Sequence, residues 1–342
     1  MGGRRMKAFE IRKTFGLEAL TVTERPDPRP GPGHVLVRVR AASLNFRDLL
    51  MVRGAYNPKQ PLPLIPLSDG AGEVVRVGEG VTRVRAGDRV AGIFAQKWLA
   101  GPPTKTGLLS TLGGPLDGLL ADHVVLHEDG LVHVPAHLTD EEAATLPCAA
   151  VTAWSALVEQ GGLRAGDTLL VLGTGGVSIF ALQFARMAGA RVIVTSSSDQ
   201  KLERARALGA AETINYKATP DWEKGARALT DGVGVDHVLE VGGGGTFARS
   251  VRAVRVAGRI SLIGVLAGST TEVNLAPILM QNIRVQGVIV GSRETFEAMN
   301  RAIVLHRLRP VVDRVFPFAE ARAALEHLAG QGHFGKIVVR MD

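Results

Sequence analysis

The sequence predicts an α/β protein in which a doubly wound parallel sheet accompanies a second, β-rich domain. Residues 6–44 and 121–134 are expected to be rich in strands, and His34–Leu44 shows the alternation of apolar and polar side chains that is typical of a half-buried strand. From about residue 139, short apolar runs alternate with helical patterns instead. Strands separated by helices indicate parallel pairing, and a chain of 342 residues is long enough for two domains.

The β-rich part is most clearly marked between His34 and Leu44. There Val35, Val37 and Val39 alternate with arginines, as in a strand with one buried face. Elsewhere in this region, glycine and proline residues mark turns between the expected strands. The expected elements are strands over 6–12, 20–24, 34–44, 70–93 and 121–134, a short helix over 45–53 and a long loop over 95–118.

The helical patterns begin after Pro135, where Thr139 precedes Glu142 by three residues. This spacing predicts a capping box at the first helix. A last strand is expected to rejoin the β-rich domain. The expected elements are strands over 168–172, 191–195, 212–215, 235–241, 259–265, 284–290 and 336–340, and helices over 200–208, 221–229, 275–281 and 319–330.

A glycine-rich turn, Gly173-Thr174-Gly175-Gly176, connects the first of these strands to a helical pattern that ends before Gly189. Gly173, Gly175 and Gly176 permit a tight turn and a close approach of backbone amides to a pyrophosphate at the start of the helix. Ser178 stands at the third fingerprint position, where Gly or Ala is usual. The pattern predicts a dinucleotide site.

Several short motifs occur in an order that resembles the medium-chain dehydrogenase/reductase superfamily, and most closely its zinc-free, quinone-oxidoreductase-like (ζ-crystallin-like) branch. The resemblance covers essentially the whole chain. It implies a GroES-like β-barrel catalytic domain over 1–138 and 307–342 and a Rossmann domain over 139–306. The motifs are Leu44–Asp48, Gly70–Val75, Val77–Val81, Gly87–Val90, Ala144–Pro147, Thr152–Trp154, the glycine turn and Phe334–Lys336.

The zinc ligands of the alcohol dehydrogenases in this superfamily are missing. Asn45 stands at the first Cys position and Ser68 at the His position, so only Cys148 remains. Neutral amide and hydroxyl groups are poor zinc ligands, and one thiolate cannot complete a tetrahedral site. Arg47 and Leu50 also replace the residues of the usual proton relay. We therefore expect no metal, with Cys148 as a small buried side chain.

The end of the second Rossmann strand predicts NADPH rather than NADH. NAD sites usually carry an Asp or Glu there, whereas this chain has Ser196, Ser197 and Ser198, followed by Lys201. Hydroxyl and ammonium groups suit a phosphate that a carboxylate would repel. Asp199, the nearest acid, is interpreted as a helix cap. The resemblance places Tyr216 beside the same phosphate.

Other cofactor contacts are expected where ligands of open parallel sheets bind, beyond the carboxyl ends of the strands. The run Gly242–Gly245 follows the fourth strand, and the resemblance places Thr152 near the nicotinamide. The remaining expected contacts are Phe46, Val177, Gly264, Val265, Leu266, Val290, Gly291 and Phe334.

The expected reaction is hydride transfer from NADPH to a small electron acceptor, a quinone or an α,β-unsaturated carbonyl, because such acceptors delocalise the arriving charge without a Lewis acid. Asn45 is the candidate hydrogen-bond donor, and Tyr56 is a candidate proton donor or lid, with water an equally good donor. The alternatives are enoyl-thioester reduction, alcohol dehydrogenase-like activity, and a non-catalytic NADPH-binding redox sensor.

Composition excludes several other classes. The formal charge is +7, but basic residues are scattered among acids, so we expect no nucleic-acid partner. One cysteine excludes an intrachain disulfide. No apolar run is long enough to span a membrane, and no signal peptide is evident, so a cytoplasmic location is expected. The apolar last Rossmann strand, 284–290, predicts a homodimer.

Overall fold

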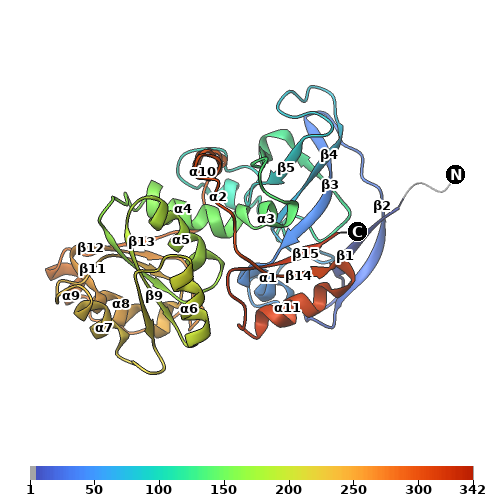
Figure 1. Cartoon of the computed structure of the whole chain (residues 1–342). Helices are drawn as coiled ribbons and strands as arrows, with labels where there is room; N and C mark the ends of the chain where they lie inside the picture. Colours follow the sequence, from blue (N-terminus) through green and yellow to red (C-terminus); the bar gives the residue numbers. More distant parts are fainter. Residues whose placement is uncertain (1–4, 342) are drawn as a thin grey trace. The chain divides into compact units, whose positions relative to one another are not determined.

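The computed structural model describes residues 5–341, and the chain divides into two compact units (Figure 1). The first unit comprises Met1–Val151 and Gly291–Asp342, and the second comprises Thr152–Val290. An α/β chain with a β-rich unit and a parallel-sheet unit is the fold class that the sequence predicts.

The first unit contains a seven-stranded sheet in the order β14-β15-β3-β4-β5-β7, with β6 also paired to β3, and a separate antiparallel pair of β1 and β2. Five α-helices accompany these strands in the described residues. The bounds are β1 Arg5–Ile11, β2 Leu20–Pro26, β3 His34–Ser43, β4 Asp69–Val77, β5 Arg89–Gly92, β6 His123–His127, β7 Leu131–His133, β14 Val312–Pro317 and β15 Lys336–Arg340; α1 Phe46–Val52, α2 Lys105–Leu108, α3 Asp140–Ala144, α10 Arg293–His306 and α11 Ala321–Ala329.

The strand β3 organises this sheet. Val35, Val37 and Val39 are buried in the core of the unit, which confirms the alternation expected from the sequence. The final strand β15 pairs antiparallel with β3, with Val338 opposite Ser43, so the tail rejoins the β-rich unit as expected. Thr139 and Glu142 form the expected capping box at the start of α3.

The second unit is a six-stranded parallel sheet in the order β10-β9-β8-β11-β12-β13. This is the strand order of a doubly wound dinucleotide-binding fold. The bounds are β8 Thr168–Leu172, β9 Arg191–Ser196, β10 Glu212–Asn215, β11 Val235–Glu240, β12 Val254–Leu262 and β13 Arg284–Gly287; α5 Gly176–Met187, α6 Asp199–Ala207, α7 Trp222–Ala228, α8 Phe247–Ala253 and α9 Ala276–Met280.

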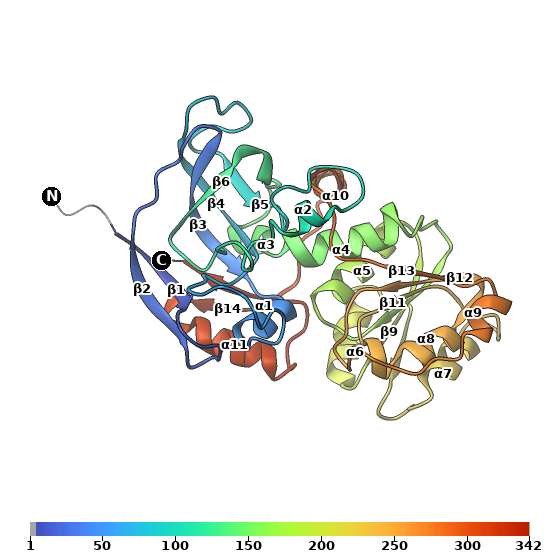
Figure 2. The same cartoon turned by 180° about the vertical axis from the view of Figure 1, so that it is seen from behind.

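One face of the parallel sheet is covered by neighbouring helices that Figure 2 shows beside one another, α7, α8 and α9. Trp222 of α7 and Val251 of α8 share a buried cluster with Leu170 and Leu172, two residues apart on β8. Such spacing places both leucines on the same face of the strand.

The chain passes between the units through α4 (Val151–Trp154), which lies between two π-helical turns, η2 (Leu146–Ala150) and η3 (Ser155–Glu159). The boundaries between the units fall at 151/152 and 290/291. The parallel-sheet unit is thus shorter than the expected Rossmann domain, whose boundaries are 138/139 and 306/307.

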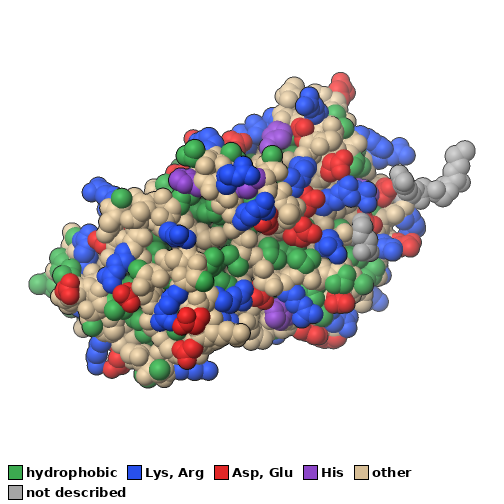
Figure 3. Space-filling view, viewed as in Figure 1, with side chains coloured by type: hydrophobic (Ala, Val, Ile, Leu, Met, Phe, Trp, Pro, Cys, Tyr) green, Lys and Arg blue, Asp and Glu red, His purple; other side chains and the backbone are tan. Residues whose placement is uncertain are grey.

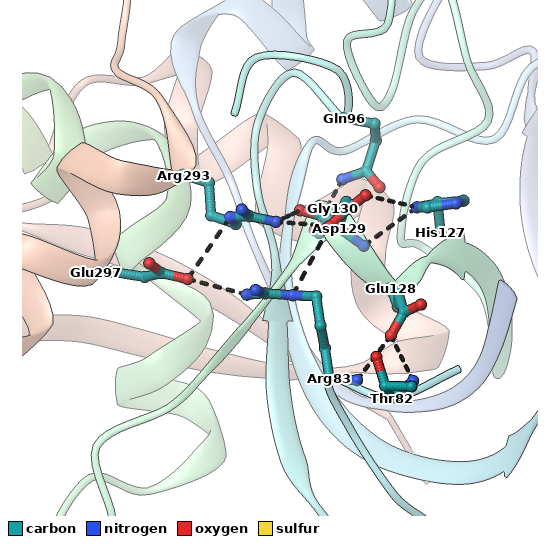
Figure 4. Close-up of polar contacts among 9 residues, drawn as sticks. All are labelled: Thr82, Arg83, Gln96, His127, Glu128, Asp129, Gly130, Arg293 and Glu297. Atoms are coloured by element: carbon teal, nitrogen blue, oxygen red, sulfur yellow. Dashed lines mark hydrogen bonds and ion pairs between the residues drawn. The ribbon is translucent and has the colours of Figure 1, made fainter. Parts of the chain in front are cut away.

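Side-chain contacts explain why α10 lies in the first unit. Arg293 donates from Nη1 to Asp129 Oδ1 at 2.9 Å, and Glu297 Oε1 accepts from Arg83 Nη2 at 3.0 Å (Figure 4). Asn300 Nδ2 adds a hydrogen bond to the carbonyl of His133, the last residue of β7. Similarly, α3 contacts β3 and β4. The periodicity of the sequence cannot reveal these long-range contacts.

Charged side chains of both signs are interspersed on the face shown in Figure 3. Within residues 5–341, none of the helices combines the length and apolar character needed to cross a bilayer.

Candidate functional site

In the second unit, the expected cofactor residues collect at one edge of the sheet. Since the strands are parallel, the residues that follow them meet at their carboxyl ends. Gly173 follows β8, Ser196 ends β9, Tyr216 follows β10 and Gly242 follows β11. The backbone N–H of Tyr216 donates to the Ser196 carbonyl at 3.0 Å, which keeps the tyrosine beside the serines.

The glycine turn has the geometry that a pyrophosphate needs. Gly173 has φ +74°, in the left-handed region that favours glycine, and a Cβ there would face open space. Gly175 caps α5, so the free amides of its first turn are available to an anion. Ser178 is buried and donates from Oγ to the Leu172 carbonyl at 2.7 Å. This hydroxyl holds the helix on the strand, as a small residue at this position should. These residues fit a dinucleotide.

The serine run lies at the start of α6. Ser198 is the N-cap and accepts from the backbone N–H of Lys201 at 3.4 Å, while Ser196 Oγ accepts from Ser198 N at 3.3 Å. The interpretation of Asp199 as the cap is therefore wrong: Asp199 is the first helical residue, and its carboxylate accepts from Asn215 Nδ2 at 2.7 Å.

The run Gly242–Gly245 has a structural explanation that the sequence did not reveal. A Cβ on Gly243 would lie 2.7 Å from the Gly268 carbonyl oxygen, and one on Gly244 would lie 2.3 Å from the Thr270 carbonyl oxygen. The close approach of the loop after β12 thus requires glycine at positions 243 and 244.

The buried carboxylate of Glu240 orders the same loop. Its Oε1 accepts from the backbone N–H groups of Gly242 at 2.8 Å and Gly243 at 2.9 Å, and from Thr246 Oγ1 at 2.5 Å. Its Oε2 accepts from Ser250 Oγ. Sequence reasoning missed Glu240; its position as an acid at the end of a buried strand was the available signal.

The expected contacts divide between the two units. Asn45, Phe46, Tyr56, Gly291 and Phe334 lie in the first unit. Phe334 is only 1% exposed there, so its side chain offers almost no surface. The remaining candidates lie in the second unit: Thr152, Gly173, Gly175, Gly176, Val177, Ser196, Ser197, Ser198, Lys201, Tyr216, Gly242, Gly264, Val265, Leu266 and Val290.

In the first unit, adjacent strand ends bring a second group of polar residues together. Ser43 at the end of β3 pairs with Asp69 at the start of β4 and with Val338 of β15. Residues just beyond these positions therefore lie close together. We call this group the polar cluster; its members are Asn45, Asp48, Ser68, Asp69 and Lys336.

Hydrogen bonds connect the polar cluster. Lys336 Nζ donates to Asn45 Oδ1 and to the Leu44 carbonyl, both at 2.5 Å. Asn45 Nδ2 donates to Ser68 Oγ at 3.4 Å, and Ser68 Oγ donates to Asp69 Oδ1 at 2.7 Å. Asn45 is thus joined to an ammonium on one side and a hydroxyl on the other.

Burial raises the pKa values of the two carboxyl groups in the polar cluster. It raises the pKa of Asp48 to about 6, against the opposing effect of the Arg47 guanidinium. It also raises the pKa of Asp69, while the Lys336 charge opposes the rise. The pKa of the nearby Cys148 thiol is raised by burial and by the Asp69 carboxylate. Cys148 therefore stays a neutral thiol at physiological pH.

The donor set does not fit a tetrahedral zinc site. Asn45 and Ser68 offer neutral oxygens, Cys148 a protonated thiol, and the Lys336 ammonium already contacts the Asn45 oxygen. A metal cation would meet this positive charge at short range. Among residues 5–341, no group of three or more His, Cys, Asp and Glu side chains is arranged to hold a metal ion.

Arg47 supports the loop that carries Tyr56. Its guanidinium donates to the Leu112 and Gly114 carbonyls, each at 3.0 Å, and lies 4.8 Å from the centroid of the Tyr56 ring. Tyr56 is half exposed, and Phe94 lies on the same guanidinium at 5.3 Å. Tyr56 thus has an accessible ring held by a buried cation.

Comparisons with known proteins identify the family of the chain. A model described as alcohol dehydrogenase GroES-like domain matches residues 31–136, and one described as zinc-binding dehydrogenase matches residues 176–304. The chain is 46% identical to a zinc-type alcohol dehydrogenase-like protein of Schizosaccharomyces pombe, over 96% of each chain.

Two further relatives carry other names. The solved structure of an NAD-dependent alcohol dehydrogenase is 36% identical, with a TM-score of 0.90 and coverage of 98% of this chain and 100% of that one. An acryloyl-coenzyme A reductase of Metallosphaera sedula is 29% identical, over 93% of this chain and 95% of its own. The chain belongs to the medium-chain dehydrogenase/reductase superfamily and is an NAD(P)H-dependent oxidoreductase.

Proposed function

We propose that the protein is a zinc-independent, NADPH-dependent reductase of quinones or α,β-unsaturated carbonyl compounds. The observation that carries this proposal is the contact between Lys336 Nζ and Asn45 Oδ1 in the polar cluster. An ammonium at that point supplies a fixed positive charge and disfavours a second cation beside it.

Bound NADPH would supply the hydride. When the hydride reaches the β carbon of an enone, the π electrons of the C=C bond move toward the carbonyl oxygen and form an enolate. Asn45 Nδ2 is the proposed donor to that oxygen, and a proton from water or Tyr56 then completes the α carbon. A hydrogen-bond donor placed where charge develops lowers the barrier without a metal.

The proposed preference for NADPH rests on the residues at the end of β9. Ser196, Ser197 and Ser198 offer hydroxyl groups, and Lys201 lies one turn into α6. The nearest carboxylate, Asp199, is engaged by Asn215. A phosphate on the ribose would meet hydrogen-bond donors and a cation there, which favours the phosphorylated cofactor.

Enoyl-thioester reduction is the second candidate, favoured by the similarity to the acryloyl-coenzyme A reductase. It uses the same hydride transfer to an activated double bond. The names of the other two relatives favour alcohol oxidation. The residues of the polar cluster do not fit the zinc ion that would act as the Lewis acid in that reaction.

A spectrophotometric screen separates these activities. NADPH oxidation is followed with 1,4-naphthoquinone, 2-cyclohexen-1-one and crotonyl-coenzyme A, and NADP⁺ reduction with ethanol and benzyl alcohol. Turnover with the quinone or the enone supports the proposal. Turnover confined to the thioester selects the second candidate, and turnover confined to the alcohols contradicts both.

We further propose a homodimer formed through β13. This strand pairs with β12 on one side, and all its residues, including Val285, are exposed in the single chain. Ile289 just beyond it is also exposed. Such an edge can pair with a second copy.

A further inference from the structure

Lys336 is the buried cation of the polar cluster, and its ammonium faces the side-chain amide of Asn45. Its side chain is 3% exposed and contacts the Leu44 carbonyl and Asn45 Oδ1. A buried ammonium is costly unless it is paired, so its position in the fold requires these acceptors and the nearby carboxylates.

The ammonium determines which way the Asn45 amide points. An ammonium has three donors and no acceptor, so only Oδ1 can face it. Nδ2 must therefore occupy the other side of the amide, where it contacts Ser68 Oγ at 3.4 Å and also donates to the Asp69 carboxylate. An acceptor oxygen of the substrate would therefore compete with Ser68 and Asp69 for this N–H group.

Ser68 reinforces the same orientation. Its hydroxyl proton is donated to Asp69 Oδ1 at 2.7 Å, which leaves the hydroxyl oxygen as an acceptor toward Asn45. Asp69 Oδ2 in turn accepts the backbone N–H of Cys148 at 3.0 Å, so the carboxylate is held from η2. Lys336 and Ser68 thus both favour the same orientation of the Asn45 amide.

The charge of Lys336 also balances the cluster. It lowers the pKa of both Asp69 and Asp48, against the larger effect of burial. Without it, two buried carboxyl groups would face each other with only Arg47 as a counter-charge.

We propose that Lys336 is a positioning residue for the reduction: it fixes the Asn45 amide so that Nδ2 is the donor to the acceptor oxygen, and it supplies positive charge to the cluster in place of a metal. This inference rests on the proposed function. Lys336 acts through Asn45 and does not itself touch the substrate.

A double-mutant cycle on the full-length protein tests this inference, with NADPH and whichever of 1,4-naphthoquinone or 2-cyclohexen-1-one the wild type reduces. Lys336→Met should lower kcat about tenfold or more and leave the Kd for NADPH within about twofold, because the Asn45 amide is then free to turn. Asn45→Ala should lower kcat at least as much, since loss of one oxyanion donor costs about 100-fold to 1,000-fold. In the double variant, the lysine change should add less than about twofold.

The exposed Lys13 provides a control, because Lys13→Met removes the same charge elsewhere in the first unit. Lys336→Arg, which keeps a cationic donor, should retain more activity than Lys336→Met. Wild-type kcat in Lys336→Met, or losses that multiply in the double variant, would overturn the inference and leave the proposed function intact.

If Lys336→Met does not fold, Lys336→Gln takes its place. This variant removes the positive charge, and its amide can offer either a donor or an acceptor to Asn45, so the orientation of the Asn45 amide is no longer fixed. A folded Lys336→Gln protein with at least a tenfold lower kcat supports the inference, and one with wild-type kcat overturns it. A wild type that reduces none of the acceptors contradicts the proposed function, and this inference with it.

Discussion

Asp48 Oδ2 accepts the backbone N–H of Asn45 at 2.8 Å, so the carboxyl group that caps α1 also holds the candidate donor in place. Burial raises the pKa of this carboxyl from 3.8 to about 6. The folded protein therefore binds the proton more tightly than the unfolded chain does. The resulting stabilisation is complete below about pH 4 and is lost as the pH rises through about 6.

Asp48→Asn removes this titration and preserves the size of the side chain. Between pH 4 and pH 7, the free energy of unfolding of the wild type should fall relative to that of the variant by up to about 3 kcal/mol, the equivalent of about two pKa units. Urea denaturation at several pH values measures the difference. Parallel pH profiles for the two proteins would contradict the assignment.

The cofactor preference can be reversed at one position. Ser197→Asp places a carboxylate where the ribose phosphate is proposed to lie, and should raise the Kd for NADPH about tenfold or more while leaving the Kd for NADH within about threefold. Ser197→Asn is the neutral control of the same size. Titration of cofactor fluorescence gives both constants. Tighter binding of NADH than NADPH by the wild type would refute the preference.

Glu240→Gln tests the carboxylate that orders the loop after β11. The glutamine nitrogen would face donors such as the Gly242 N–H, leaving buried groups unpaired at a cost of about 1–3 kcal/mol. We expect lower thermal stability and weaker NADPH binding. The exposed Glu272→Gln serves as the control. Equal melting temperatures for Glu240→Gln and the wild type would show that the carboxylate is not needed.

Cys148→Ala distinguishes a packing role from a zinc-ligand role. The raised pKa keeps its thiol protonated, so we expect kcat to remain within about threefold of the wild type. A loss of activity of 100-fold or more, with the fold intact by circular dichroism, would point to metal ligation.

Val285→Lys should weaken the proposed dimer, because it places a charge on the exposed strand β13. Light scattering after size-exclusion chromatography should show a dimeric wild type and a larger monomer fraction for the variant. A monomeric wild type would contradict the proposed dimer.

Local patterns predicted much of this fold. The bounds expected for β8, β10 and β15 match the structure, because short apolar runs between turns define buried strands well. The helix α10 was not anticipated, and its place in the first unit depends on Arg293 and Asp129, which are far apart in the sequence. The loop expected over 95–118 also contains α2, a single short turn.

The cofactor residues and the polar cluster also differ in how far they could be predicted from local sequence patterns. The glycine turn and the serine run are local motifs, so the sequence identified them directly. The contact of Lys336 with Asn45 depends on the pairing of β15 with β3, which brings together residues from opposite ends of the chain. Lys336 was visible only as part of a family motif, with no indication of its role.

The central claim is hydride transfer to an electron-poor acceptor without zinc. Its most direct test is the rate of NADPH oxidation with 1,4-naphthoquinone and 2-cyclohexen-1-one, measured for protein dialysed against a chelator and assayed with the chelator present. We predict turnover with at least one acceptor, at a rate within about twofold of the undialysed protein. Turnover that disappears on dialysis and returns with stoichiometric Zn²⁺ would contradict the account.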